Sequence, residues 1–304
     1  MTPSDASHSR WSDLDRPPLN VPALRRGLLL PGGLWTALDV VDSTGSTNSD
    51  LAARAAGLAE GTVLVAEKQT AGRGRLDRTW SAPARSGLFF SVYLTPGAVP
   101  VQRWGWLPLL AGVAAAAGLA KSAGVDVALK WPNDLLVRIP DDSDSDSDEP
   151  GPGETPSGEE RKTGGILAER AGDGVVIGIG LNVSLRADEL PAPTAASLAL
   201  AGAVSTDRET LLRGVLHSLE QWYGRWRAAD GDAAASGLQE AYAAACATLG
   251  RPVRAQLPGE RTLTGEAVAI DGDGRLVLST GDGLQEPVSA GDIVHLRGAG
   301  GGLT

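Results

Sequence analysis

The apolar residues of this chain occur in short runs that have the lengths of strands and helices. From residue 34 onward, β-branched and aromatic residues gather in runs bounded by glycine, proline and serine, and this pattern predicts strands. Two alanine- and leucine-rich stretches predict helices, and the first ends at Gly61, a residue type that commonly terminates helices. The expected strands are 34–42, 62–69, 87–96, both arms of 127–138, 164–170 and 174–183, and the expected helices are 49–61 and 106–124.

The pattern changes twice in the C-terminal part of the chain. Residues 207–248 carry apolar side chains at helical spacing and predict two helices packed against the core. After Gly250, short apolar runs alternate with glycine-rich turns and predict a small β-barrel of about 50 residues. Its expected strands are 252–257, 263–270, 275–280 and 292–297. Strands and helices gathered in separate groups are typical of an α+β protein, which is the fold class that we predict.

Composition indicates how the chain is divided. Residues 1–33 mix serine, aspartate, proline and arginine without periodicity, and they predict a mostly flexible N-terminal extension. Residues 141–160 contain nine acidic and no basic residues, so this segment cannot bury enough apolar area to offset the entropy of ordering it. We therefore expect a main domain at 34–248 with a disordered acidic insert at 140–161, a barrel at 249–298 and a tail at 299–304.

Charge and cysteine content exclude several classes of function. The net charge of −10 comes almost entirely from the acidic insert, because the rest of the chain is near −1. Phosphate neutralisation normally supplies much of the affinity for DNA, and a chain without a lysine-rich face is not expected to bind nucleic acid. One cysteine excludes an intrachain disulfide, and three scattered histidines show no zinc-site spacing, so no protein-held metal site is expected. The sequence shows no secretory signal and no apolar run of about 18 residues, which predicts a cytoplasmic protein that does not enter a membrane.

The densest concentration of anion-binding residues is the loop GRGRLDRTW at 72–80. Arg73, Arg75 and Arg78 carry permanent charge and forked donors suited to a phosphate or a carboxylate, and the glycines let the backbone come close to a ligand. The loop lacks the Gly-Lys-Ser/Thr ending of a Walker sequence. By itself it therefore fits a solvated basic turn as well as a site for an oligoanion.

This loop belongs to an ordered set of motifs. They are STN at 46–48, EKQTAGRGR at 67–75, KWPND at 130–134, KTGGILAE at 162–169 and GIGLNV at 178–183, followed by the barrel. Each motif alone is weakly specific, but the ordered set resembles the catalytic core of biotin protein ligases over roughly residues 35–297. The resemblance implies a mixed β-sheet catalytic domain of the biotin/lipoate ligase type at 34–248 and an SH3-like barrel at 249–298.

The resemblance also implies a reaction. ATP and biotin are the expected substrates and Mg²⁺ the expected cofactor. The enzyme would activate biotin as biotinyl-5'-AMP with release of pyrophosphate. It would then transfer biotin to a lysine of a biotin carboxyl carrier domain of acyl-CoA carboxylase or pyruvate carboxylase.

The biotin site implied by the resemblance combines uncharged polar residues with the arginine loop. A ureido ring offers one carbonyl acceptor and two N–H donors, which hydroxyl and amide side chains can satisfy without introducing net charge. Ser46 and Thr47 equally fit the N-cap of the following helix. The residues expected to bind biotin are Ser46, Thr47, Asn48, Gln69, Arg73, Gly74, Arg75 and Lys162.

Lys162, Arg75, Arg73 and Asp134 are the catalytic residues that the resemblance implies. The arginines would offset the repulsion between the biotin carboxylate and the α-phosphate of ATP, and a closed loop would exclude water from the adenylate. Lys162 would contact the carboxylate and the phosphate under attack, although outside its motif it would be an ordinary surface lysine. Asp134 would help to hold magnesium or orient partners near the acceptor lysine, and stabilisation of the turn is its simpler alternative role.

The nucleotide site implied by the resemblance overlaps the catalytic residues. Trp80 would cover adenine or biotin with its aromatic face, whereas Trp131, next to a proline, is expected in the core. The expected nucleotide-binding residues are Arg75, Arg78, Trp80, Asn133, Lys162 and Asn182.

Two departures and two alternatives accompany this assignment. Leu76 and Asp77 stand where the family usually has an arginine and a glycine, and the acidic insert lengthens the connection before Lys162. A lipoate ligase or octanoyltransferase has a similar catalytic domain, but KWPND, GRGR and the barrel favour biotin. A biotin-responsive DNA-binding repressor is disfavoured because only about 34 residues with closely placed prolines precede the core.

Overall fold

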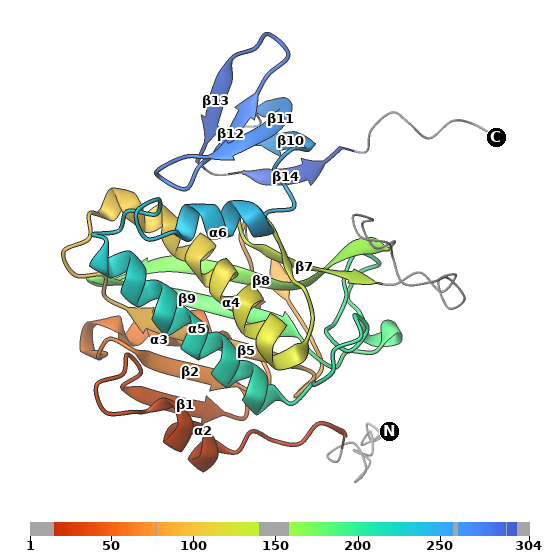
Figure 1. Cartoon of the computed structure of the whole chain (residues 1–304). Coiled ribbons are helices and arrows are strands. Elements are labelled where there is room, and N and C mark those ends of the chain that lie inside the picture. Colours follow the sequence, from red (N-terminus) through yellow and green to blue (C-terminus); the bar gives the residue numbers. More distant parts are fainter. Residues whose placement is uncertain (1–14, 77, 140–157, 258–260, 290, 297–304) are drawn as a thin grey trace, which may run out of the picture.

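The computed structural model describes residues 15–76, 78–139, 158–257, 261–289 and 291–296. Its centre is a seven-stranded sheet in the order β1-β2-β5-β9-β8-β7-β6 (Figure 1). The strands of this sheet are β1 (Ala37–Val41), β2 (Thr62–Ala66), β5 (Gly87–Leu94), β6 (Ala128–Lys130), β7 (Asp134–Ile139), β8 (Glu159–Ala171) and β9 (Gly174–Asn182). The helices are α2 (Val21–Leu28), α3 (Thr47–Arg54), α4 (Leu107–Ala123), α5 (Arg208–Ala228) and α6 (Leu238–Ala245).

Strand pairing in the central sheet is mixed. Strands β1 and β2 pair in parallel, and the other neighbours in the order pair antiparallel. A parallel pair needs a long crossover connection, and helix α3 lies in the connection between β1 and β2. Mixed strands with helices grouped around them confirm the predicted α+β class.

The central sheet is covered on both faces. Successive strand residues point to opposite faces, so Val63 and Val65 of β2 join the large core with α4 and α5, whereas Leu64 packs with Leu51 of α3. Helices α4 and α5 lie side by side across one face of the sheet, as Figure 1 shows. All eight residues of β5 are buried, as expected for a strand in the middle layer.

Helix α4 is the centre of the larger core. The helical stretch Val101–Ala123 is long and apolar enough, by length and composition, to cross a membrane, although we predicted no such run from the sequence. Two thirds of its most apolar window is buried inside the fold, and Leu107, Leu110 and Leu119 are fully buried. The apolar character of α4 is therefore explained by its place in the core.

The N-terminal segment differs from the flexible extension that we predicted. Residues 1–14 lie outside the described residues, but Val21–Leu28 form α2, with Asn20 accepting a hydrogen bond from the Ala23 N–H at 3.1 Å. Leu24 and Leu28 are fully buried against the core. The burial of these two side chains explains why a segment without sustained periodicity is ordered.

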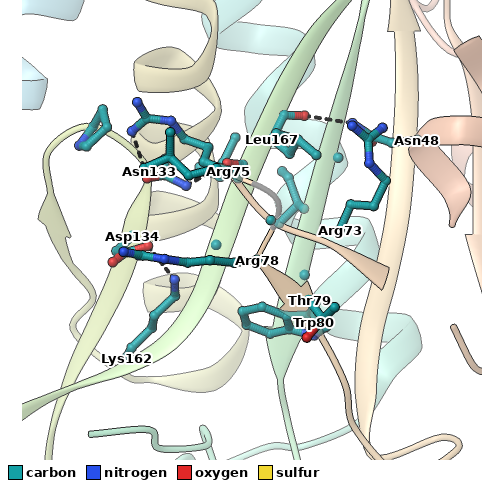
Figure 2. Close-up of a pocket in the computed structure, with 18 of the residues that line it drawn as sticks. Asn48, Arg73, Arg75, Arg78, Thr79, Trp80, Asn133, Asp134, Lys162 and Leu167 are labelled. Carbon is teal, nitrogen blue, oxygen red and sulfur yellow. Dashed lines mark hydrogen bonds and ion pairs between the residues drawn. The ribbon is translucent and has the colours of Figure 1, made fainter. Parts of the chain in front are cut away.

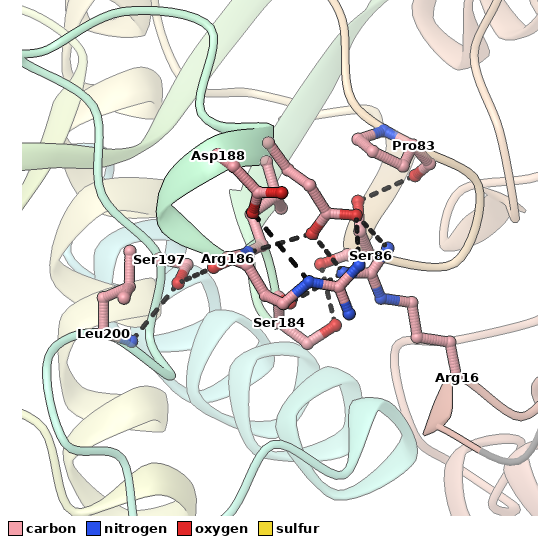
Figure 3. A network of polar contacts seen from close by, with 10 residues as sticks. Arg16, Pro83, Ser86, Ser184, Arg186, Asp188, Ser197 and Leu200 are labelled. Atoms are coloured by element: carbon pink, nitrogen blue, oxygen red, sulfur yellow. Dashed lines mark hydrogen bonds and ion pairs between the residues drawn. The ribbon is translucent and has the colours of Figure 1, made fainter. Parts of the chain in front are cut away.

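Arg16 fixes the chain before α2 to the region after β9. Its guanidinium donates to Glu189 through both Nη atoms, at 3.0 and 2.5 Å, and to the Ser184 carbonyl at 2.9 Å (Figure 3). This hydrogen bonding to Arg16 lowers the pKa of Glu189. The N-terminal segment therefore contributes directly to the packing of the main domain.

The C-terminal end of the predicted disordered insert lies in a strand. Residues 140–157 lie outside the described residues, as does the predicted tail at 299–304. Glu159, Glu160 and Arg161, which we assigned to the disordered insert, belong instead to β8 and pair with β7. Pairing with an existing strand satisfies the backbone of these charged residues while their side chains stay near solvent.

The C-terminal sheet has five antiparallel strands in the order β13-β12-β11-β10-β14. Four strands were predicted, and β13 lies in a stretch that we expected to be a turn and loop. The strands are β10 (Pro252–Gln256), β11 (Thr262–Ile270), β12 (Leu276–Ser279), β13 (Gln285–Val288) and β14 (Asp292–His295).

Two indole groups connect the C-terminal sheet to the main domain. Trp106 Nε1 donates to the Gly272 carbonyl at 2.8 Å, and Trp131 Nε1 donates to the Gly274 carbonyl at 3.1 Å. A Cβ at Gly105 would lie 2.6 Å from the Asp273 carbonyl oxygen, so only glycine fits this contact. The turn between β11 and β12 therefore packs against the start of α4 and against the turn that follows β6.

His295 at the end of β14 is half-buried beside residues 248–251, which precede the C-terminal sheet. Its Nε2 lies 3.1 Å from Thr248 Oγ1 and its Nδ1 lies 3.5 Å from Arg251 Nη1. Burial lowers the pKa of His295 to about 4, an effect strengthened by Lys130 and Arg251 and opposed by Glu160. In the unfolded chain the His295 imidazole is protonated near pH 6.5. Between about pH 4 and pH 6.5 the unfolded chain therefore binds more protons than the folded protein.

We expect the free energy of unfolding of His295→Gln to depend less on pH than that of the wild type between about pH 4 and pH 6.5. Wild-type free energy of unfolding should fall relative to that of the variant as the pH is lowered from about 6.5 to about 4. Urea denaturation at several pH values measures the difference, and His217→Gln is the matched control. A constant difference between wild type and His295→Gln across this range would contradict the prediction.

Candidate active site

A cavity opens between the arginine loop, the turn after β6, the middle of β8 and β9 and the start of β14 (Figure 2). Almost all of the predicted site residues meet there, although they come from distant parts of the chain. Those lining it are Ser46, Thr47, Asn48, Gln69, Arg73, Gly74, Arg75, Arg78, Trp80, Asn133, Asp134 and Lys162.

The arginine loop is a hairpin whose two-residue strands are β3 (Gly72–Arg73) and β4 (Thr79–Trp80). Inside the hairpin, the Gly74 N–H donates to the Arg78 carbonyl at 2.6 Å. Leu76 has a φ of +54° and a mostly exposed side chain, whereas Asp77 lies outside the described residues. A leucine in the left-handed region is strained, and Leu76 is one of the two positions at which we expected this loop to depart from the family that the sequence resembles.

The polar end of the cavity is formed by the start of α3. Ser46 caps this helix by accepting from the Ser49 N–H at 3.5 Å, so the capping role considered for it is present. Thr47 donates from its backbone N–H and its hydroxyl to Gln69 Oε1, at 2.9 and 3.2 Å. The carbonyl oxygen of Gln69 is thus held by Thr47, which fixes the orientation of the Gln69 amide within the cavity wall.

Two residues that the sequence analysis did not single out support this end of the cavity. Ser91 of β5 is fully buried, and its hydroxyl lies 2.7 Å from Thr47 Oγ1 and 2.6 Å from Asn48 Oδ1. Glu169 of β8 accepts a hydrogen bond from Asn48 Nδ2 at 3.1 Å and forms an ion pair with Arg73 at 3.0 Å. Neither partner could be inferred from sequence spacing, because both contacts form only when the sheet assembles.

The charged end of the cavity contains Lys162, Asp134 and Arg75. Lys162 Nζ lies 2.5 Å from Asp134 Oδ1 and 5.7 Å from the centre of the Trp80 ring. Arg75 Nη1 donates to Asn133 Oδ1 at 3.4 Å. Burial lowers the pKa of Arg75 and the nearby Asp134 raises it, but an arginine stays charged under all ordinary conditions.

Glycines in β8 and β9 make room for the ring of Trp80. A Cβ at Gly180 would lie 3.2 Å from the indole, and a Cβ at Gly165 would lie 3.5 Å from both the indole and Lys162 Nζ. The Trp80 Nε1 atom is buried and has no hydrogen-bond partner among the described residues. A buried donor without a partner is costly, so this N–H is available for an acceptor on a ligand.

The C-terminal sheet contributes to the cavity wall through Gly291, Asp292 and Ile293. The Asp292 carboxylate accepts hydrogen bonds from both Nη atoms of Arg78, one of them at 3.4 Å. This hydrogen bonding raises the pKa of Arg78. Asp292 was not among the site residues predicted from the sequence. Arg78 therefore connects the arginine loop to β14.

Asn182 is the predicted site residue that does not line the cavity. It is buried in β9, and its Nδ2 donates to the Ala196 carbonyl at 2.9 Å. The same stretch is bonded to the backbone of Lys162. The Lys162 N–H donates to the Thr194 carbonyl, and the Ala196 N–H donates to the Lys162 carbonyl, both at 2.8 Å. Asn182 thus lies behind the wall and fixes the backbone beside Lys162.

Comparison with protein families gives two matches. Residues 38–183 match the biotin/lipoate A/B protein ligase family, and residues 248–296 match the biotin protein ligase C-terminal domain. Together the two matches include every residue that lines the cavity.

Curated relatives cover most of the chain. The biotin acetyl-CoA-carboxylase ligase of Mycobacterium tuberculosis is 43% identical over 287 residues, 93% of this chain and 97% of that protein. The bifunctional ligase/repressor BirA of Bacillus subtilis is 34% identical over 83% of this chain and 71% of its own length.

Solved structures agree with these relatives. A biotin protein ligase from Aquifex aeolicus in complex with biotin and ATP has a TM-score of 0.66 and 26% identity, covering 86% of this chain and all of that one. The Leishmania major biotin protein ligase in complex with biotinyl-5-AMP has a TM-score of 0.54 and 22% identity, covering 84% of this chain and 99% of that one, and it supports the fold alone.

Proposed function

Because the chain belongs to the biotin protein ligase family, we propose that it is an ATP-dependent biotin protein ligase. The biotin carboxylate attacks the α-phosphorus of ATP, the bond to pyrophosphate breaks, and biotinyl-5'-AMP forms. The amine of a carrier lysine then attacks the acyl carbon, and AMP leaves. The observation that carries this proposal is a single cavity with neutral hydrogen-bonding residues at one end and Lys162, Arg75 and Arg78 at the other.

The neutral end is suited to the ureido ring. Ser46, Thr47 and Gln69 offer hydroxyl and amide groups, and Thr47 and Ser46 are almost fully buried. Hydrogen bonds in a dry site favour a ligand that matches each donor and acceptor, because a mismatched ligand leaves a buried polar group unpaired. Gly74 and Arg73 would close this end from the side of the arginine loop.

The charged end is suited to the reacting phosphate. Lys162 and Arg75 would stabilise the negative charge that develops when the carboxylate attacks the α-phosphate. Asp134 holds the Lys162 ammonium at the cavity wall before substrates arrive. Closure of the arginine loop would exclude water from the acyl adenylate, which water would otherwise hydrolyse.

The remaining wall residues would bind the nucleotide. Trp80 presents its ring and an unpartnered N–H, Asn133 presents an amide next to Arg75, and Arg78 would contact phosphate after leaving Asp292. Asn182 would act on the nucleotide only indirectly, through the segment that bonds the Lys162 backbone.

Magnesium would arrive with the ATP phosphates. Among the described residues no group of three His, Cys, Asp or Glu side chains could hold a metal ion, but Asp134 and Asp292 both line the cavity. Magnesium in nucleotide sites usually takes one or two carboxylates and completes its ligands with phosphates and water, so these residues fit that role. The ion would neutralise charge on the phosphates during pyrophosphate release.

The acceptor would be the biotin carboxyl carrier domain of acetyl-CoA carboxylase, since the M. tuberculosis relative is named for that substrate. The carrier domain of pyruvate carboxylase is a second candidate with the same acceptor chemistry. We place the reaction in the cytoplasm, where the free Cys246 would stay reduced. We do not propose binding to nucleic acid, because the chain is acidic.

Pyrophosphate exchange tests the proposed reaction. Purified protein should catalyse exchange of labelled pyrophosphate into ATP when biotin is present, and should show no exchange with lipoate. Exchange with lipoate and not with biotin would instead support a lipoate ligase, and no exchange with either acid would contradict an adenylating ligase.

A further inference from the structure

We propose that Glu169 is a positioning residue that holds both Asn48 and Arg73 and thereby shapes the biotin pocket from behind its wall. This inference rests on the proposed function. It also changes the role of Asn48, because its amide hydrogen bonds are made to protein, and of Arg73, because its charge is balanced by Glu169.

The Glu169 carboxylate is engaged by two segments that are distant in sequence. Arg73 Nη2 lies 3.0 Å from Oε1, and Arg73 Nη1 lies 3.1 Å from Oε2. Asn48 Nδ2 donates to Oε2 at 3.1 Å. A forked pair of this kind fixes direction as well as distance, so Glu169 sets where the Arg73 guanidinium lies.

The hydrogen-bonding capacity of Asn48 is almost fully used within the protein. Its two amide N–H groups donate to Glu169 and to the Leu167 carbonyl, the latter at 3.0 Å, and its Oδ1 accepts from Ser91. A Cβ at Gly178 would lie 2.1 Å from Asn48 Oδ1, so the side chain fills a slot that a glycine leaves open. Asn48 therefore cannot donate to biotin without breaking a bond to the protein.

Arg73 lies at the base of the arginine loop, whereas Arg75 lies farther along it. The charge of Arg73 is balanced by Glu169, while the hydrogen-bond partner of Arg75 is the neutral amide of Asn133. The first arginine thus anchors the hairpin to β8, and the second remains available for phosphate. Asn48 and Arg73 both line the cavity, so Glu169 couples its neutral end to the loop that closes it.

The Glu169→Gln substitution tests this role in pyrophosphate exchange. The introduced glutamine would keep an acceptor for Asn48 but would lose the charge that holds Arg73, so the pocket would be less well organised before biotin enters. We expect the KM for biotin to rise about tenfold, the equivalent of about 1.4 kcal/mol. The KM for ATP and the kcat should each change less than about threefold, because the phosphate-binding end keeps its own contacts.

Matched variants separate positioning from general destabilisation. Glu286 forms an exposed pair with Arg261 at 2.7 Å in the C-terminal sheet, so Glu286→Gln should leave both KM values unchanged. Glu169→Asp keeps the charge and should recover part of the biotin affinity. Glu169→Gln should also be combined with Arg73→Gln. If Glu169 acts through Arg73, the KM for biotin of this double variant should be no more than about twofold above that of the single variant with the higher KM.

Several results would overturn the inference. These are an unchanged biotin KM in Glu169→Gln, an equal rise in the KM values for biotin and ATP, and strictly additive effects in the double variant. If the wild-type protein catalyses no pyrophosphate exchange, the proposed function itself is contradicted. Failure of the inference and failure of the proposed function are therefore distinguishable.

Discussion

Lys162→Ala should lower the rate of biotinyl adenylate formation by about 100-fold, as expected when one preorganised charge is removed from a dry catalytic site. In the structure, Lys162 Nζ is held at the cavity wall by Asp134 and lies beside the Trp80 ring. Alanine removes the ammonium and leaves Asp134 without its partner, facing the position where negative charge develops. Single-turnover formation of biotinyl-5'-AMP from labelled ATP measures this loss directly.

Folding should be little affected by the same change. The Lys162 side chain is about one third exposed, and its ion pair with Asp134 contributes little to stability at such a site. Lys121→Ala, at an exposed position in the last turn of α4, is the matched control and should keep the wild-type rate. An unchanged single-turnover rate in Lys162→Ala would remove this residue from the proposed mechanism.

The order of strands and helices could be predicted from the sequence where apolar patterns are long and regular. Strands β2, β5 and β9 and helix α4 lie in such runs, because each is buried in the central layers of the fold. Helix α2 was missed because it has eight residues with a proline at its start, and it is stabilised by burial of Leu24 and Leu28 rather than by helix propensity. Strand β13 was missed because QEPV contains a proline and lies at the edge of its sheet.

The candidate site followed from the sequence only as far as its motifs extend. Charged and polar residues concentrated between strands, together with the order of the motifs, led to the residues that line the cavity. The partners of those residues could not be found in this way. Glu169 lies 96 residues from Arg73, and Asp292 lies 214 residues from Arg78, so no local pattern links them.

Glu67→Gln should lower the free energy of unfolding by about 3 kcal/mol, because it leaves a buried guanidinium without its counter-charge. Glu67 and Arg208 form an ion pair at 2.5 Å with side chains only 5% and 7% exposed. Glu67 also accepts from the Leu19 N–H at 2.7 Å, and Arg208 donates to the Pro17 carbonyl at 2.5 Å. The pair therefore joins β2, α5 and the N-terminal segment at one point.

Guanidinium chloride denaturation measures the loss, with Asp39→Asn as the control. Asp39 pairs with Arg25 at 3.1 Å, but both side chains are about half exposed, so its removal should cost less than about 1 kcal/mol. The double variant Glu67→Leu with Arg208→Met should be more stable than Glu67→Gln, because no buried charge remains unpaired. A Glu67→Gln protein within about 1 kcal/mol of wild type would show that water or a neighbouring group compensates Arg208.

Glu67→Gln should also affect substrate binding in the active site. Glu67 follows β2 directly, its carbonyl accepts from the Arg85 N–H at 2.8 Å, and Gln69 lies two residues farther along the chain. Loss of the buried pair should loosen this segment and raise the KM for biotin more than the KM for ATP, because Gln69 lies at the neutral end of the cavity, where it bonds Thr47. Pyrophosphate exchange on folded Glu67→Gln protein at low temperature separates this effect from unfolding. Equal KM values in the variant and wild type would show that the ion pair stabilises the fold without shaping the biotin pocket.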